Sequence, residues 1–135
     1  MTTNHSPYKS KGGLGRLTNA LRYSSQGLAA AFRHEAAFRQ ELLLAVVLVP
    51  LALWIGRSGG EIALLIGSVV FVLIVELLNS ALEALADTIT VDHHPLIGRA
   101  KDLGSAAVLL ALLFSAAVWV WIIVSHIAGS GFPTP

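Results

Sequence analysis

The chain contains no cysteine and few charged residues. Charged residues make up 13% of its 135 positions, whereas an ordinary soluble domain carries about 25%. The lack of cysteine excludes disulfides, thiolate zinc sites and a cysteine nucleophile. The scarcity of charge argues against a disordered chain, a conventional soluble enzyme and a nucleic-acid-binding protein. Because 55% of the residues are hydrophobic, the composition favours a small integral membrane protein.

Familiar nucleotide signatures are also absent. The sequence has no GxxxxGK[ST], no GxGxxG and no kinase catalytic loop. A nucleotide-using chain of this kind would have to hold Mg²⁺ with carboxylates and phosphates with basic side chains. Residues 1–41 hold no long apolar run, so we expect no signal peptide. We expect the polar ends, 1–13 and 129–135, to be disordered or flexible.

Three apolar stretches indicate membrane spans. Roughly 20 apolar residues cross the hydrocarbon core as a helix. The expected spans are about 36–55, 62–86 and 103–127. Pro50 lies inside the first, and a proline kink is tolerated in a helical bundle. Tryptophans lie toward the outer ends of the first and third stretches, as interfacial aromatics do: Trp54, Trp119 and Trp121.

The basic residues predict the orientation. Of nine lysines and arginines, six precede the uninterrupted apolar run of the first span, which begins at Leu42. Two lie between the second and third spans, and Arg57 alone lies between the first and second. Cytoplasmic loops carry the excess of lysine and arginine. We therefore expect the N-terminus and the second loop in the cytoplasm. Three spans then place the C-terminus in the periplasm.

Residues 14–35 form an amphipathic pattern. Its apolar residues fall within roughly 60° of a helical wheel: Leu14, Leu17, Leu21, Leu28 and Phe32. Its arginines fall on the other side: Arg16, Arg22 and Arg33. Such a helix suits the membrane surface. It could be a simple anchor, or an anchor that also forms one wall of an active site. The predicted fold is an all-α integral membrane protein with one surface helix and three transmembrane helices.

The second span carries an acidic stripe. Glu76, Asn79, Glu83 and Asp87 share roughly 80° of arc on a helix. A charged residue at the bilayer centre costs about 2.5–3.5 kcal/mol on insertion scales. The glutamates could be protonated and bonded to neighbouring helices, or Glu83 and Asp87 could be solvated surface. Neither alternative explains Glu76 well, because the residues before it are almost all apolar. The stripe therefore favours a functional role.

The loop before the third span carries a second polar cluster. His93 and His94 are adjacent, and adjacent side chains rarely converge on one ion, so a nucleotide contact or plain surface is favoured over a metal site. Lys101 and Asp102 open the third span, followed by small residues that include Ser105. This arrangement leaves room for a ligand, or it merely caps and anchors the helix at the membrane edge.

Three blocks of sequence resemble the prokaryotic diacylglycerol kinase family. They are HEAAFRQE at 34–41, ELLNSALEALAD at 76–87 and GRAKDLGSAA at 98–107. The resemblance covers about residues 14–127, and the third block is similar to the proteobacterial branch. It implies a homotrimeric inner-membrane enzyme with a single membrane domain at 14–128. That enzyme would move the γ-phosphate of MgATP to diacylglycerol and release phosphatidate.

The resemblance also implies residue roles. Glu76 matches the general base, with Asn79 and Lys101 as further catalytic residues, and Glu35 and Glu83 match the carboxylates that hold Mg²⁺ on ATP. The implied nucleotide contacts are Arg16, Tyr23, Glu35, Glu83, Asp92, His94, Lys101 and Asp102. The implied positions near the lipid substrate are Arg39, Glu41, Trp54, Glu76, Ser105 and Trp119. The segment Asp92-His93-His94 departs from the family's commoner Glu-Tyr-His, which leaves His93 without an assigned contact.

Several functions remain open from the residues themselves. The lipid acceptor could be diacylglycerol, undecaprenol or another lipid alcohol. A proton-coupled transporter could use Glu76 to exchange a proton for a cation. A non-catalytic assembly subunit could use the small residues at 104–107 for close helix packing. The expected partners are ATP, diacylglycerol and bilayer lipids, and no nucleic acid.

Overall fold

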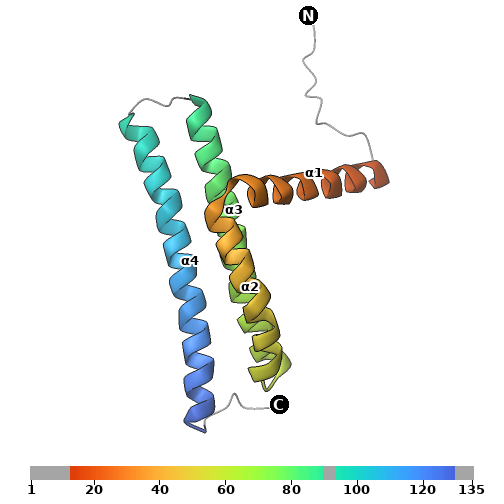
Figure 1. Cartoon of the computed structure of the whole chain (residues 1–135), viewed down its shortest axis with the longest axis vertical. Helices are drawn as coiled ribbons and strands as arrows, with labels where there is room; N and C mark the ends of the chain where they lie inside the picture. The colour runs from red at the N-terminus through yellow and green to blue at the C-terminus, as the bar shows by residue number, and fades with distance from the viewer. Residues whose placement is uncertain (1–12, 90–93, 130–135) are drawn as a thin grey trace, which may run out of the picture. The chain divides into compact units, whose positions relative to one another are not determined.

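The computed structural model describes residues 13–89 and 94–129, and the elements within them are α-helices. Figure 1 shows the helices in chain order: α1 (Gly13–His34), α2 (Ala36–Ile55), α3 (Gly59–Ile89) and α4 (Pro95–Ile127). The chain divides into two compact units, Met1–Glu35 and Ala36–Pro135. The predicted all-α fold is confirmed, because α2, α3 and α4 are each long and apolar enough to cross a membrane. The prediction of disordered or flexible ends at 1–13 and 129–135 lies outside the described residues, apart from Gly13 and Gly129.

The first unit is the amphipathic helix α1. It runs through Gly27 without a break, and the Glu35 N–H donates to the Ala31 carbonyl at 2.8 Å just beyond its end. Arg33 and His34 occupy its last turn, where cations interact favourably with the helix dipole. Its leucines and Phe32 are exposed. An uncovered apolar stripe beside arginines is what a helix at a membrane surface requires.

In the second unit, α3 packs against both α2 and α4. The core between them is apolar and centres on Ala52, Leu65 and Ile122, which are fully buried, together with Val69 and Trp119. Many of the outward-facing leucines, valines and isoleucines are exposed. A hydrophobic outer surface on a three-helix unit suits a lipid environment rather than water.

The helices α3 and α4 extend beyond the predicted spans. The α4 helix begins at Pro95, not near 103, because a proline fits the first helical turn, where its missing N–H has no partner to lose. With 33 residues, α4 is about 50 Å long and exceeds the roughly 30 Å hydrocarbon core. Lys101 and Asp102 therefore lie within α4 and not at its start, which corrects the prediction that they open the helix.

An ion pair joins the N-terminus of α3 to the C-terminus of α4. The buried Glu61 carboxylate lies 2.9 Å from Nε2 of His126. It also accepts a hydrogen bond from the Arg57 backbone N–H at 2.8 Å. The Ser58 hydroxyl in turn accepts from the Glu61 N–H at 3.2 Å, so residues 58–61 form a variant of the capping box. Glu61 is therefore positioned by local capping and by the pairing of two distant helix ends.

Removing either member of this pair is expected to destabilise the second unit. We expect Glu61→Ala to lower the free energy of unfolding by about 3–5 kcal/mol, because breaking a buried pair leaves its partner uncompensated. The double variant Glu61→Ala/His126→Ala should lose less than the sum of the single losses. Unfolding in detergent micelles measures both. Ser125→Ala is the control, because among the described residues that hydroxyl donates to the Ile122 carbonyl of its own helix. Additive single losses would contradict the pairing.

Candidate functional site

The acidic stripe of α3 changes from buried to exposed along the helix. Glu76 is only 4% exposed, Asn79 and Glu83 are half-buried, and Asp87 is exposed. The Asn79 amide, through Nδ2, donates a hydrogen bond to Oε1 of Glu83 at 3.2 Å. Glu76 and Glu83 are seven residues apart, which is about 10 Å along the helix. The stripe thus places one carboxylate in a buried position and a second about two turns closer to the exposed end.

The second helix of the site is α4. Lys101 donates through Nζ to Oδ1 of Asp87 at 2.9 Å, and the two side chains are 38% and 59% exposed. Exposed ion pairs contribute little to stability, so Lys101 can exchange Asp87 for another anion at small cost. Asp102 and Ser105 are exposed on the same helix, and Gly104 lies against Asn79. Two helices therefore bring charged and amide groups to one end of the unit.

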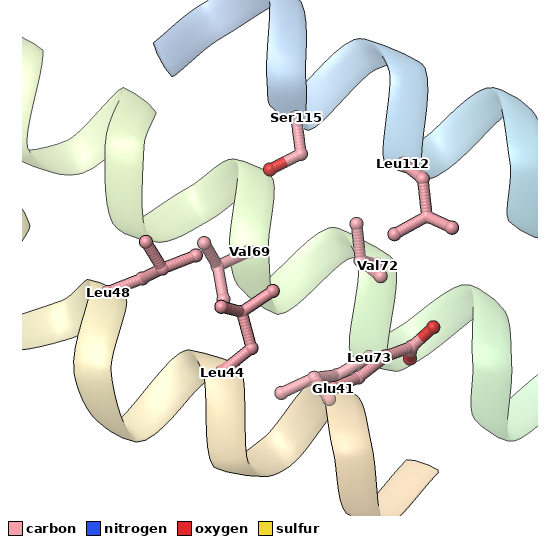
Figure 2. A pocket seen from close by; sticks show the side chains of 8 residues that line it. All are labelled: Glu41, Leu44, Leu48, Val69, Val72, Leu73, Leu112 and Ser115. Carbon is pink, nitrogen blue, oxygen red and sulfur yellow. The ribbon is translucent and has the colours of Figure 1, made fainter. Parts of the chain in front are cut away.

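A small pocket lies beside the buried end of the stripe. Its volume is about 40 Å³, and its lining comes from α2, α3 and α4. Figure 2 shows these side chains: Glu41, Leu44, Leu48, Val69, Val72, Leu73, Leu112 and Ser115. The Glu41 Oε2 atom is buried and has no hydrogen-bond partner among the described residues. Glu41 also interacts electrostatically with Glu76. Two carboxylates thus lie near each other, and one of them, Glu41, lines a mostly apolar pocket.

The other residues predicted to lie near a lipid are scattered over the second unit. Arg39 is exposed on α2, two residues before Glu41. Trp54 is 82% exposed at the far end of α2, about 20 Å along the helix from Glu41. Trp119 is buried in the apolar core. The structure therefore brings Glu41 and Glu76 together and leaves Trp54 apart from them.

The predicted nucleotide and metal positions are divided between the two compact units. Arg16, Tyr23 and Glu35 belong to the first unit, whereas Glu83 belongs to the second. His94, also in the second unit, is exposed and extended just before α4. The prediction for Asp92 lies outside the described residues. In the part of the chain that is described, no three His, Asp or Glu side chains gather around one ion position.

The donor set nevertheless suits Mg²⁺. This cation takes one or two carboxylates and fills its remaining positions with phosphate oxygens and water. Asn79 engages only one of the two carboxylate oxygens of Glu83. The hydrogen bond from Asn79 to Oε1 orients the half-buried Glu83 carboxylate. Residues that hydrogen-bond to metal ligands orient those ligands in the same way. Glu83 thus fits the ligand role, with Asn79 as its supporting partner.

The sequence patterns do not single out Ser68 and Ser115 inside the bundle. Ser68 and Ser115 share a buried hydrogen bond of 3.1 Å between α3 and α4, and Ser115 also lines the pocket. The Ser80 hydroxyl is buried with no partner among the described residues. A lone serine in an apolar span is a weak signal, because its hydroxyl usually bonds to its own helix. Only the packing of α3 on α4 reveals the Ser68–Ser115 pair.

These features define a class of protein: a small, multi-pass membrane protein with an acidic stripe and a basic partner at one end of its helical unit. The profile of prokaryotic diacylglycerol kinases matches residues 22–123. The chain belongs to that family. It is 51% identical to a diacylglycerol kinase of Pseudomonas aeruginosa over 118 residues, which is 87% of this chain and 96% of the relative.

Two further relatives support the same assignment. The chain is 50% identical to a diacylglycerol kinase of Haemophilus influenzae over 107 residues, which is 79% of this chain and 91% of the relative. It is 46% identical to a diacylglycerol kinase of Escherichia coli K12 over 114 residues, which is 84% of this chain and 93% of the relative. The relatives are bacterial, the matches cover nearly their whole length, and this chain has three candidate spans. The chain is therefore a multi-pass bacterial membrane protein.

Proposed function

We propose that the chain is a diacylglycerol kinase that transfers the γ-phosphate of ATP to the free hydroxyl of diacylglycerol and forms phosphatidate. The observation that carries the proposal is Glu76, a buried carboxylate on a membrane helix. It lies in a chain whose relatives at 46–51% identity are named for this activity. A lipid hydroxyl reacts where the lipid head meets a water-soluble nucleotide, and the stripe runs from a buried to an exposed end.

In the proposed reaction Glu76 is the general base. It accepts the proton of the lipid hydroxyl while that oxygen forms a bond to the γ-phosphorus, and the bond from phosphorus to the ADP oxygen breaks. Lys101 and Arg16 neutralise the charge that develops on the transferring group. Glu35 and Glu83 would hold Mg²⁺, which when bound would neutralise and align the phosphates. Asn79 orients Glu83 through the hydrogen bond described above.

The remaining assignments follow from the same proposal. Further nucleotide contacts come from Tyr23, Asp92, His94 and Asp102. The lipid lies near Arg39, Glu41, Trp54, Ser105 and Trp119. The protein works as a homotrimer in the inner membrane, with its N-terminus in the cytoplasm and its C-terminus in the periplasm. The pocket beside Glu41 and Glu76 supports a lipid-side role for Glu41.

A panel of lipid alcohols tests the proposal. The purified chain in micelles is given labelled ATP, Mg²⁺ and one acceptor at a time: diacylglycerol, monoacylglycerol, ceramide or undecaprenol. We expect the fastest transfer to diacylglycerol. Faster transfer to undecaprenol would mean that diacylglycerol is not the preferred acceptor. No transfer to any alcohol, together with substrate-dependent proton flux in liposomes without ATP, would replace the kinase by a transporter.

A further inference from the structure

Gly104 on α4 lies directly against the Asn79 side chain of α3. A Cβ built on Gly104 would collide with Oδ1 of Asn79 and would lie 3.4 Å from its Cγ. The next atom, Cδ2 of Leu82, is at an ordinary contact distance of 3.8 Å. The collision is thus with one end of one amide. The backbone of α4 can lie this close to the Asn79 amide because residue 104 has no side chain.

The Asn79 amide is fixed on both sides. Its Nδ2 donates to Glu83 at 3.2 Å, and its Oδ1 is buried without a hydrogen bond from any described residue. Oδ1 lies against the position that a Cβ at residue 104 would occupy. In glycine a hydrogen replaces that Cβ, so one Cα–H of Gly104 points at Oδ1. Such Cα–H···O contacts recur between closely packed helices. They give this buried oxygen a weak partner.

The backbone of α4 does not itself require glycine at 104. Positive φ values among the described glycines occur only at Gly13 and Gly129, so Gly104 has an ordinary helical conformation. Glycine inside a helix is less favourable than alanine. An added Cβ at Gly67 of α3, by contrast, would meet nothing within 4 Å. What distinguishes Gly104 is its contact with Asn79.

We propose that Gly104 is a positioning residue for phosphoryl transfer. It seats the Asn79 amide so that Nδ2 reaches Glu83, and through this bond it sets the Glu83 carboxylate that would face the nucleotide metal. This inference rests on the proposed kinase function. A methyl group at 104 displaces the amide, either by turning Nδ2 away from Glu83 or by moving α4 away from α3. Both displacements disturb the carboxylate that holds the metal.

Kinetics of Gly104→Ala test the proposal, with Gly67→Ala as the matched control in open space. We expect Gly104→Ala to lower kcat/KM for MgATP at least about tenfold, because small misplacements of catalytic geometry have effects of this order. The KM for diacylglycerol should stay within about twofold of wild type, the usual scatter for independent sites. The control should keep both constants. Wild-type kinetics for Gly104→Ala would overturn the proposal.

A double-variant cycle separates positioning from packing. In an Asn79→Ala background the amide is gone, so adding Gly104→Ala should change kcat/KM less than about twofold. A full additional loss in that background would mean that Gly104 acts by another route and would overturn the proposal. If Gly104→Ala does not fold alone, the double variant should fold, because Asn79→Ala removes the group in collision. If neither Gly104→Ala nor the double variant folds, that result would also contradict the proposal.

A spectroscopic readout is independent of activity. The chain has three asparagines, Asn4, Asn19 and Asn79, so ¹⁵N-asparagine labelling gives three side-chain amide signals, and Asn79→Ala identifies one. Gly104→Ala should shift only the Asn79 signal, and Gly67→Ala should shift none. An unmoved Asn79 signal would overturn the positioning role even in an active enzyme. A wild-type protein without kinase activity would instead overturn the proposed function, whatever the amide signal does.

Discussion

Glu76→Gln is expected to remove nearly all phosphoryl transfer and to leave the fold intact. Glutamine has the same shape as glutamate, but its amide cannot accept the proton of the lipid hydroxyl. A positioned general base contributes about 10²–10⁴-fold to rate, and we expect a loss in that range. The measurement is kcat with diacylglycerol and MgATP in micelles. The unfolding midpoint of the variant should not fall, because a buried neutral amide replaces a buried acid.

The matched control is Glu61→Gln on the same helix. It makes the same chemical change fifteen residues away, about 22 Å along α3, at the ion pair with His126. This control should lose stability but keep wild-type kcat per folded molecule. The two variants therefore give opposite patterns, one in activity and one in stability. Turnover of Glu76→Gln at the wild-type rate would mean that the base is another residue.

The sequence predicts the helices and the local part of the site. Long apolar runs define the spans, and a period of 3.6 residues places Glu76, Asn79 and Glu83 on one face of α3. The bond from Asn79 to Glu83 joins residues four apart, so it follows from that period. The start of α4 differs most from the prediction, because Pro95 is the first residue of that helix and does not belong to the preceding loop.

Contacts between helices could not be predicted in the same way. Glu61 and His126 are 65 residues apart, and Ser68 and Ser115 are 47 apart. Helical periodicity gives the face of each residue but not the register at which two helices pack, which depends on side-chain shape along the whole interface. The contact of Gly104 with Asn79 has the same origin. In the sequence this glycine is simply one small residue among several at the start of a predicted span.

Neutralising the two proposed metal ligands should abolish magnesium-dependent ATP binding. Mg²⁺ prefers charged oxygen ligands, and a glutamine amide supplies a neutral oxygen in nearly the same place. At Glu83, glutamine can still accept the hydrogen bond from Asn79, so the change isolates the charge. We expect Glu83→Gln to weaken MgATP binding at least about 10–100-fold, the loss typical of altered outer partners of metal sites. Glu35→Gln should behave alike, since Mg²⁺ takes both carboxylates in the proposed site.

Calorimetric titration of ATP at several Mg²⁺ concentrations measures this effect without turnover. Wild-type affinity should rise steeply with Mg²⁺, whereas the double variant Glu35→Gln/Glu83→Gln should bind ATP weakly at every concentration. Glu61→Gln should follow the wild-type curve, because that acid is paired with His126 at the opposite end of α3. If the double variant also follows it, the metal is held elsewhere. The other polar residues of the acidic stripe would then serve to form hydrogen bonds between helices. Glu76 would be the one residue of the stripe with a role in the reaction.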